Sequence, residues 1–178
     1  MNDFGMKIET GRLLLRRWRI DDAESLYKYA SDGRVSELAL WPRHTTVEMS
    51  RKVIEDYFLP NDYCFAITLK DTGEAIGCIG FVPCGDEHYA VGEHECELGY
   101  WLGFDYWNKG IVTEAVEAFI VYSRECLGLE SLLITVDKRN VASCRVAEKC
   151  GFKFVSDYEY DGVDSKAYRL DLKGVLEA

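Results

Sequence analysis

The segment that most restricts the fold is a strand, a tight turn and a helix in direct succession. Residues 95–102 read ECELGYWL, an aromatic and partly alternating stretch that is typical of a strand. After a turn around Lys109-Gly110, apolar residues recur at helical spacing as far as Leu127, at Val112, Val116, Phe119 and Ile120. The chain must therefore contain a strand that leads through a short turn into a helix.

The turn YWNKGIVTEA has two open interpretations on these residues alone. The first amides of a helix have no intrahelical partners and lie at the positive end of the helix dipole, so they favour an anion. Lys109 adds positive charge, and Gly110 has no Cβ to keep an anion from the backbone. Yet the segment matches neither the G-x-x-x-x-G-K-[ST] nor the G-x-G-x-x-G phosphate motif. A plain strand-to-helix connection with a surface lysine is the alternative.

The rest of the chain alternates between strand and helix patterns without a linker, repeat or low-complexity segment. Upstream, Asp21-Asp22 favours a helix start, and Thr45-Thr46-Val47-Glu48 predicts a capping box for a helix that ends before Pro60. The segment NVASCRVAEKC predicts a further helix that stops at Gly151. The other strands are predicted at RLLLRRWR, YCFAITLK, AIGCIGFV, SLLITVD, FKFVSDYEY and SKAYRLDL. The order β-α-α-β-β-β-α-β-α-β-β indicates a single mixed α/β domain over residues 1–178.

Composition limits the class of partner. The chain has 178 residues, 48% apolar and 29% charged, which is the composition of an ordinary folded domain. The net charge of −10 argues against nucleic-acid binding through phosphate neutralisation. An acidic surface favours a cationic or amine-bearing partner, although an acidic face also simply promotes solubility.

Cysteines and terminal segments point to a cytoplasmic protein. The seven cysteines form no C-x-x-C pair and no tight cluster with histidine, so we expect reduced thiols and no metal site. The first residues, MNDFGMKIETGR, lack a basic region followed by an apolar one, and no export signal is predicted. The longest apolar stretch, AIGCIGFVPCG, is too short to cross a bilayer.

A second group of polar residues lies in VDKRNVASCRVAEKCGF (136–152). A strand ends there, Asn140 is suited to cap a helix, and Ser143 falls in the first turn of that helix. Simple helix capping accounts for either residue considered alone.

Taken together, the two segments resemble the GNAT superfamily of N-acetyltransferases, and more closely its branch of ribosomal-protein N-terminal acetyltransferases. The resemblance covers nearly the whole chain: ETGRLLLRRW, ECELGYWL, YWNKGIVTEA and the closing N-x-x-S-x-x-V-x-E-K-x-G-F occur in the family's order. It implies the GNAT fold, of class α/β (α+β). This is a mixed, mostly antiparallel twisted sheet of about seven strands with about four flanking helices. A V-shaped splay is expected between the fourth and fifth strands, ECELGYWL and SLLITVD.

The resemblance also implies how acetyl-CoA would be bound. The family's R/Q-x-x-G-x-G/A loop, whose amides hold the pyrophosphate, falls on Trp107-Asn108-Lys109-Gly110-Ile111-Val112. Val112 stands where Gly or Ala is usual, and Thr113 follows with a hydroxyl that can supplement the amides. The strand residues Tyr100, Trp101 and Leu102 match the edge that bonds the pantetheine arm through its backbone. Asn140 matches a further pantetheine contact.

The expected chemistry is attack of an amine on the thioester, which needs a base and a group to stabilise the thiolate. Glu97, on the strand that precedes the loop, matches a glutamate that is common in this branch; an orienting or ion-pairing carboxylate is the other interpretation. Glu93 and Glu95 are close rivals, and His88 and His94 are nearby titratable groups. The family's tyrosine acid is replaced by Ala147, so the resemblance assigns the thiolate to Ser143. Cys144 allows an acyl-cysteine route, but it has no histidine partner in a supporting motif.

The leading hypothesis is therefore a cytoplasmic N-acetyltransferase that uses acetyl-CoA and acts on a primary amine, either a protein N-terminus or a small molecule. A non-catalytic acyl-CoA-binding or sensing module is the alternative. No metal, nucleic acid or membrane partner is expected, and a homodimer is compatible with the family.

Overall fold

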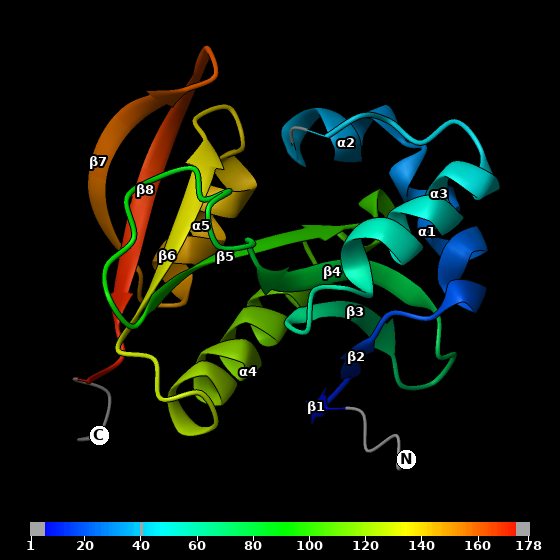
Figure 1. Cartoon of the computed structure of the whole chain (residues 1–178), viewed down its shortest axis with the longest axis horizontal. Helices are drawn as coiled ribbons and strands as arrows, with labels where there is room; N and C mark the ends of the chain where they lie inside the picture. Colours follow the sequence, from blue (N-terminus) through cyan, green and yellow to red (C-terminus); the bar gives the residue numbers. More distant parts are fainter. Residues whose placement is uncertain (1–5, 40, 174–178) are drawn as a thin grey trace. The chain divides into compact units, whose positions relative to one another are not determined.

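The computed structural model describes residues 6–39 and 41–173, and the chain packs as two compact units (Figure 1). Unit 1 comprises Met1–Gly80 and Tyr100–Ala115, and unit 2 comprises Phe81–Gly99 and Val116–Ala178. The strand β5 (Glu95–Leu102) and the helix α4 (Ile111–Glu125) each contribute residues to both units. The single domain expected over residues 1–178 stays a prediction.

Unit 1 is an antiparallel sheet packed against helices. Its hydrogen-bonded strand order is β1-β2-β3-β4, followed by the last residues of β5. The bounds of these strands are β1 Lys7–Glu9, β2 Leu13–Arg17, β3 Cys64–Leu69 and β4 Ala75–Phe81. The helices are α1 Ala23–Ala30, α2 Gly33–Ala39 and α3 Val47–Val53, the last continued by a π-helical turn over Ile54–Phe58.

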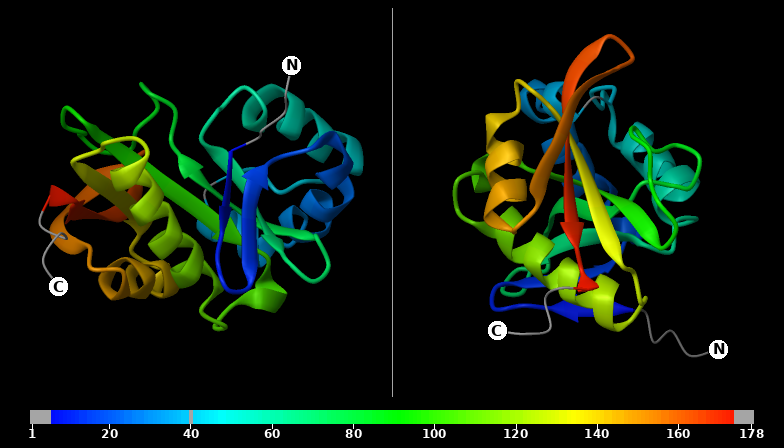
Figure 2. Two further views of the ribbon diagram at one scale, coloured as in Figure 1. Left: turned by 90° about the horizontal axis from the view of Figure 1, so that it is seen from below. Right: turned by 90° about the vertical axis from the view of Figure 1, so that its left-hand side faces the viewer.

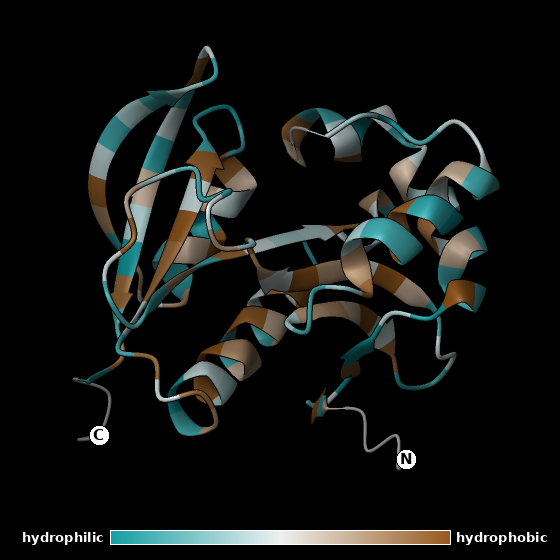
Figure 3. Cartoon of the chain, in the orientation of Figure 1, coloured by the Kyte–Doolittle hydropathy of each residue, from teal (hydrophilic) through white to brown (hydrophobic). Residues whose placement is uncertain are grey.

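The core of unit 1 lies between α1, α3 and the β3–β4 hairpin. Trp18, Leu26 and Ile54 are almost fully buried there, beside small strand residues such as Ala66 and Ala75. Figure 3 shows the corresponding concentration of hydrophobic colour along β3 and β4. Every residue of β4 is buried, which is the pattern of a central strand covered on both faces.

Unit 2 is built from β6 (Ser131–Asp137), β7 (Lys153–Tyr160), β8 (Val163–Asp171) and α5 (Val141–Lys149). With the first half of β5, the strand order is β5-β6-β8-β7, and Figure 2 shows α5 alongside these strands. β5 and β6 are parallel and pair only from Glu95↔Ser131 to Glu97↔Leu133, although β6 continues to Asp137. This short ladder agrees with the splay expected between ECELGYWL and SLLITVD.

The mixed α/β fold is confirmed, with local differences from the sequence prediction. The described residues contain eight strands and five α-helices, against the expected seven or so strands and four or so helices. The additional elements are the short strand β1 and the short helix α2. The capping box predicted at Thr45–Glu48 is wrong. Thr46 is the N-cap and its hydroxyl accepts from the Met49 amide, so the third helical position is Met49, whose side chain has no oxygen to complete a box. The two-residue turn Asp161-Gly162 joins β7 to β8, with both residues at positive φ.

We expect Gly77→Ala to destabilise the protein, because β4 and β5 approach closely in unit 1. A Cβ at Gly77 would lie 2.5 Å from the Trp101 carbonyl oxygen, a backbone atom that cannot move aside cheaply. The free energy of unfolding, measured by urea denaturation, should fall by about 1–3 kcal/mol. Gly33→Ala is the control, because nothing lies within 4 Å of its Cβ position. Equal stability of the two variants would contradict the close approach.

Candidate active site

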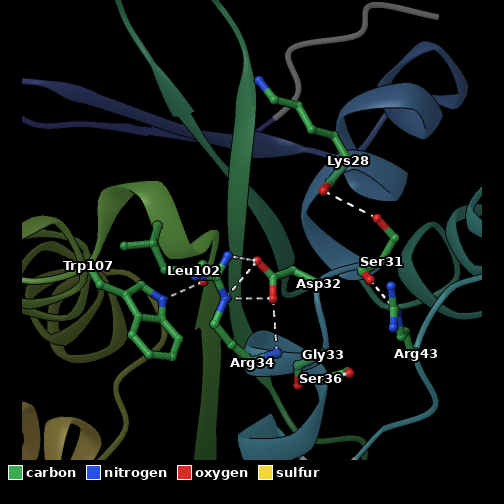
Figure 4. A network of polar contacts seen from close by, with 9 residues as sticks. All are labelled: Lys28, Ser31, Asp32, Gly33, Arg34, Ser36, Arg43, Leu102 and Trp107. Carbon is green, nitrogen blue, oxygen red and sulfur yellow. Dashed lines mark hydrogen bonds and ion pairs between the residues drawn. The ribbon is translucent and has the colours of Figure 1, made fainter.

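The loop that follows β5 in unit 1 is held in shape by its own aromatic residues. After Gly103, residues Phe104–Tyr106 form a 3-10 turn that the sequence did not predict. The Trp107 indole nitrogen then donates to the Leu102 carbonyl oxygen at 2.8 Å (Figure 4), so the loop closes back on the strand. The Phe104 ring packs against Trp107, with ring centroids 5.1 Å apart. The position of Trp107 therefore fixes where the strand ends and the loop begins.

Helices α1 and α2 support the other side of this loop. The Arg34 guanidinium stacks on the Phe104 ring at 3.4 Å from its centroid, and Asp32 accepts hydrogen bonds from that guanidinium (Figure 4). Tyr29 lies so close to Gly103 that a Cβ there would be 2.4 Å from its ring. Only glycine fits at position 103 without displacing Tyr29.

The residues predicted to bind pyrophosphate form an exposed bend at the start of α4. Asn108 and Gly110 have positive φ values of 58° and 71°, and the helix begins directly afterwards at Ile111. Asn108, Lys109 and Gly110 are exposed. Asparagine and glycine are the residues that most readily adopt this left-handed conformation. The backbone amides at the helix start can therefore face an anion.

An ion pair from the turn between β1 and β2 fixes the first turn of α4. Arg12 donates through its backbone nitrogen and Nε to the two Glu114 carboxylate oxygens, at 2.9 and 2.7 Å. Its Nη1 also donates to the Lys109 carbonyl oxygen at 2.9 Å, and the Thr10 hydroxyl adds a bond to Glu114. Partial burial would raise the pKa of Glu114, but Thr10 and Arg12 hold this pKa below its ordinary value. Arg12 thus neutralises Glu114, the acidic residue in the first turn of α4.

The other predicted cofactor residues of unit 1 have mixed environments. The Trp101 side chain packs in the core against Trp18 and Trp41, with ring centroids 6.4 and 5.8 Å away. Leu102 and Ile111 are buried, whereas Tyr100, Val112 and Thr113 are half-buried. Any role of the buried Leu102 and Ile111 in binding would therefore fall to backbone atoms.

In unit 2, Glu97 is a buried carboxylate that accepts several hydrogen bonds. Its side chain is only 2% exposed. Oε1 accepts from the Thr135 hydroxyl at 2.5 Å and faces His88 Nδ1 at 2.7 Å, while Oε2 accepts from the His88 backbone nitrogen at 2.7 Å. Glu97 also marks the last residue of β5 that pairs with β6. The predicted catalytic carboxylate is thus engaged with a histidine rather than open to solvent.

His88 is a functional candidate that could not be singled out from the sequence alone. It belongs to the loop between β4 and β5, and its ring lies against Tyr160 with centroids 4.7 Å apart. The hydrogen bond to Glu97 raises the pKa of His88 above its ordinary value. A loop histidine nine positions before a strand glutamate has no recognisable spacing, so only the fold shows this pair.

The rival acidic residues have other environments. Glu95 is buried and forms an ion pair with Arg169 at 2.6 Å, with further bonds from Ser131 and the Gly92 amide. Glu93 is exposed and lies 3.8 Å from His94. Glu95 therefore has a structural role at the start of β5, and Glu93 is a surface residue.

The predicted capping by Asn140 is confirmed in unit 2. Its side-chain oxygen accepts from the Ser143 amide at 3.1 Å, which caps α5. The Ser143 side chain is half-buried in the first turn, and Ala147 is fully buried one turn further on. Of the predicted site residues, Glu97, Asn140 and Ser143 thus belong to unit 2. The predicted residues Tyr100–Leu102 and Trp107–Thr113 belong to unit 1.

Among residues 6–39 and 41–173, no group of three or more His, Cys, Asp or Glu side chains could hold a metal ion. No helix within those same ranges is long and apolar enough to span a membrane.

Comparison with known proteins identifies the family. The model of the acetyltransferase (GNAT) domain matches residues 12–153. An uncharacterised N-acetyltransferase, p20 of Bacillus licheniformis, is 31% identical over 160 residues, which cover 84% of this chain and 85% of p20.

Two solved structures have the same fold. The GNAT-family acetyltransferase of Bacillus anthracis superimposes with a TM-score of 0.81 at 26% identity, covering 94% of this chain and 99% of that one. A candidate ribosomal-protein-serine acetyltransferase from Vibrio cholerae gives a TM-score of 0.75 at 26% identity, with 93% and 97% covered.

The chain therefore belongs to the GNAT acetyltransferases, and it is an enzyme of that class. GNAT acetyltransferases use acetyl-CoA as their acetyl donor.

Glu95→Gln should lower stability in a pH-dependent way. Burial would raise the pKa of Glu95, but Arg169 and the other donors hold it below its ordinary value. The stabilisation is present above the unfolded pKa of about 4.3 and is lost as pH falls through the lower folded pKa. The variant should lose about 1–3 kcal/mol in urea unfolding at pH 7, and this deficit should shrink near pH 3.

The matched control is Glu93→Gln, because the Glu93 side chain is 92% exposed and should contribute almost nothing. A deficit for Glu95→Gln that is the same at both pH values would contradict the ion-pair account.

Proposed function

We propose that this acetyltransferase transfers the acetyl group from acetyl-CoA to a primary amine by direct attack of the amine on the thioester. The observation that carries the proposal is that β5 leads from a buried, hydrogen-bonded carboxylate, Glu97, into a glycine bend that opens α4. In this proposal the carboxylate assists removal of a proton from the amine, and the bend binds the diphosphate of acetyl-CoA. Family membership supplies the reaction class.

The residues at the start of α4 fit a diphosphate. Gly110 has the left-handed conformation that turns successive amides towards one side, and the helix dipole adds partial positive charge there. Lys109 contributes a full positive charge, and Arg12 neutralises Glu114, the acidic residue of this turn. We assign Trp107, Asn108, Lys109, Gly110, Ile111, Val112 and Thr113 to the diphosphate. We assign backbone groups of Tyr100, Trp101 and Leu102, together with Asn140, to the pantetheine arm.

Ser143 is proposed to stabilise the departing thiolate. The Ser143 amide donates to the Asn140 side chain, so the helix cap holds the serine in place. In the proposal, its hydroxyl donates a hydrogen bond to the sulfur of the departing CoA thiolate. A serine hydroxyl is a weak acid, and it would stabilise a thiolate mainly by hydrogen bonding. Ala147 cannot stabilise the thiolate, since it is buried and its side chain has no polar atom.

The acceptor is a protein N-terminus or a small amine, and one finding bears on the choice. The Vibrio cholerae neighbour, 26% identical, is described as a candidate ribosomal-protein-serine acetyltransferase. This favours a protein N-terminal amine. Thiol release from acetyl-CoA should be measured with N-terminal peptides beginning with serine or alanine, and in parallel with amino acids, polyamines and aminoglycosides. Turnover confined to the peptides would support the protein acceptor, and turnover confined to small amines would exclude it.

Gly110→Ala should weaken acetyl-CoA binding. A side chain at φ 71° strains the bend by about 1–2 kcal/mol, and its Cβ would lie 3.7 Å from the Arg12 guanidinium that holds the bend. The dissociation constant of CoA, measured by calorimetry, should rise by about tenfold or more.

Gly162→Ala is the control, because Gly162 has a similar φ of 77° in the turn after β7. A Gly110→Ala variant that binds CoA like the wild type would show that this bend is not the phosphate site.

Ser143→Ala should slow turnover without weakening acetyl-CoA binding. Alanine keeps the amide that donates to Asn140, so the helix cap is preserved. Loss of a hydrogen bond to a charged sulfur costs about 1.5–3 kcal/mol, which corresponds to a roughly 10- to 100-fold lower kcat. Steady-state kinetics with varied acetyl-CoA separates kcat from KM. An unchanged kcat would remove Ser143 from the mechanism.

A further inference from the structure

We infer that His88, rather than Glu97 itself, accepts the proton of the substrate amine, and that Glu97 positions His88. The inference rests on the proposed function, since it names the proton acceptor of the same reaction. It follows from the hydrogen bonds that Glu97 makes and from the one ring nitrogen of His88 that remains available beside them.

The Glu97 carboxylate is poorly placed to meet an amine directly. Its side chain is 2% exposed, and its two oxygens contact the His88 ring, the His88 backbone nitrogen and the Thr135 hydroxyl. These groups come from the β4–β5 loop and from β6, so they surround the carboxylate from two elements. An amine would have to displace one of them to reach an oxygen of Glu97.

The His88 ring has the opposite arrangement. An ionised carboxylate can only accept a hydrogen bond, so Nδ1, 2.7 Å from Glu97 Oε1, must carry the proton. In the neutral ring Nε2 is then the basic nitrogen. The His88 side chain is 37% exposed, so a substrate amine can approach it. This is the arrangement of a histidine base held in one tautomer by a buried carboxylate.

The negative groups around His88 favour the protonated form of its ring. Glu97 of β5 is the nearest, Asp86 of the same loop adds further negative charge, and Tyr160 of β7 packs edge-on against the ring. The hydrogen bond and charge of Glu97 raise the pKa of His88. Because the active form is the neutral ring, the rate should fall as pH drops through this raised pKa.

The proposed step conserves protons and electrons. The substrate ammonium gives one proton to His88 Nε2, which releases it to solvent, and Nδ1 keeps its proton on the Glu97 side. The amine lone pair then forms the bond to the acetyl carbonyl carbon. The carbon–sulfur bond breaks with its electron pair on sulfur, and the thiolate takes the second proton from nitrogen.

The variant that tests this assignment is His88→Asn. An asparagine amide nitrogen can replace Nδ1 as donor to Glu97, but it offers no basic nitrogen. We expect kcat/KM to fall by about 100-fold or more and the acidic limb of its pH profile to disappear. The CoA dissociation constant and the melting temperature should stay close to those of the wild type.

His94→Asn is the matched control for the histidine change. His94 is exposed, and its φ of 57° is a conformation that asparagine adopts readily, so activity should be unaffected. Glu97→Gln provides a second, independent variant. Without the carboxylate charge the pKa of His88 should fall towards its ordinary value, so the acidic limb should move to lower pH while the maximal rate decreases.

The outcomes separate this inference from the proposed function. A wild-type enzyme that binds CoA but releases no thiol with any amine contradicts the proposed function itself. An active wild type together with a His88→Asn variant of near-normal rate and unchanged acidic limb overturns only the role of His88. Should His88→Asn not fold, the Glu97→Gln profile decides: a limb shifted to lower pH supports the inference, and an unshifted limb overturns it.

Discussion

The interaction on which the candidate catalytic centre depends is the burial of the Glu97 carboxylate. Placing a carboxylate in the interior costs several kcal/mol unless donors replace the lost water. Here the donors are the Thr135 hydroxyl and the backbone and ring nitrogens of His88. Because two of the three bonds reach one loop residue, the carboxylate fixes the β4–β5 loop against the end of the β5–β6 ladder. A single buried charge thus sets both the loop conformation and the orientation of the histidine ring.

The bend before α4 depends on a different kind of constraint, the neutralisation of a charge near a helix start. Glu114 lies in the first turn of α4, where a second anion would meet its repulsion. Arg12 binds both oxygens of this carboxylate and also the Lys109 carbonyl, so the backbone of the bend is held in place. The ring contact between Phe104 and Trp107 and the hydrogen bond from the Trp107 indole to the Leu102 carbonyl oxygen fix the other end of the loop.

The sequence predicted the elements and the site segments because their signals are local. The helix spacing after Gly110, the alternating strand before it and the Asn140 cap can all be recognised within a few residues, and each is confirmed. The short β1 and α2 were missed because pieces of this length have too few residues to show a period.

Partners that are remote in sequence could not be predicted in the same way. The Arg12–Glu114 pair spans 102 positions and the Glu97–Thr135 bond spans 38, and neither leaves a spacing pattern. His88 could be recognised only as one loop histidine among others until the fold placed it on Glu97. The assignments of Glu97 and Ser143 to catalysis, and of the bend to the cofactor, remain proposals.

Whether Glu97 orients His88 is tested most directly by a nitrogen-15 NMR titration of the His88 ring in the enzyme. We expect neutral His88 to carry its proton on Nδ1, and its titration midpoint to lie above the ordinary histidine value of about 6.5. A neutral ring protonated on Nε2, or a midpoint at or below 6.5, would show that Glu97 does not orient this histidine, and would contradict the account.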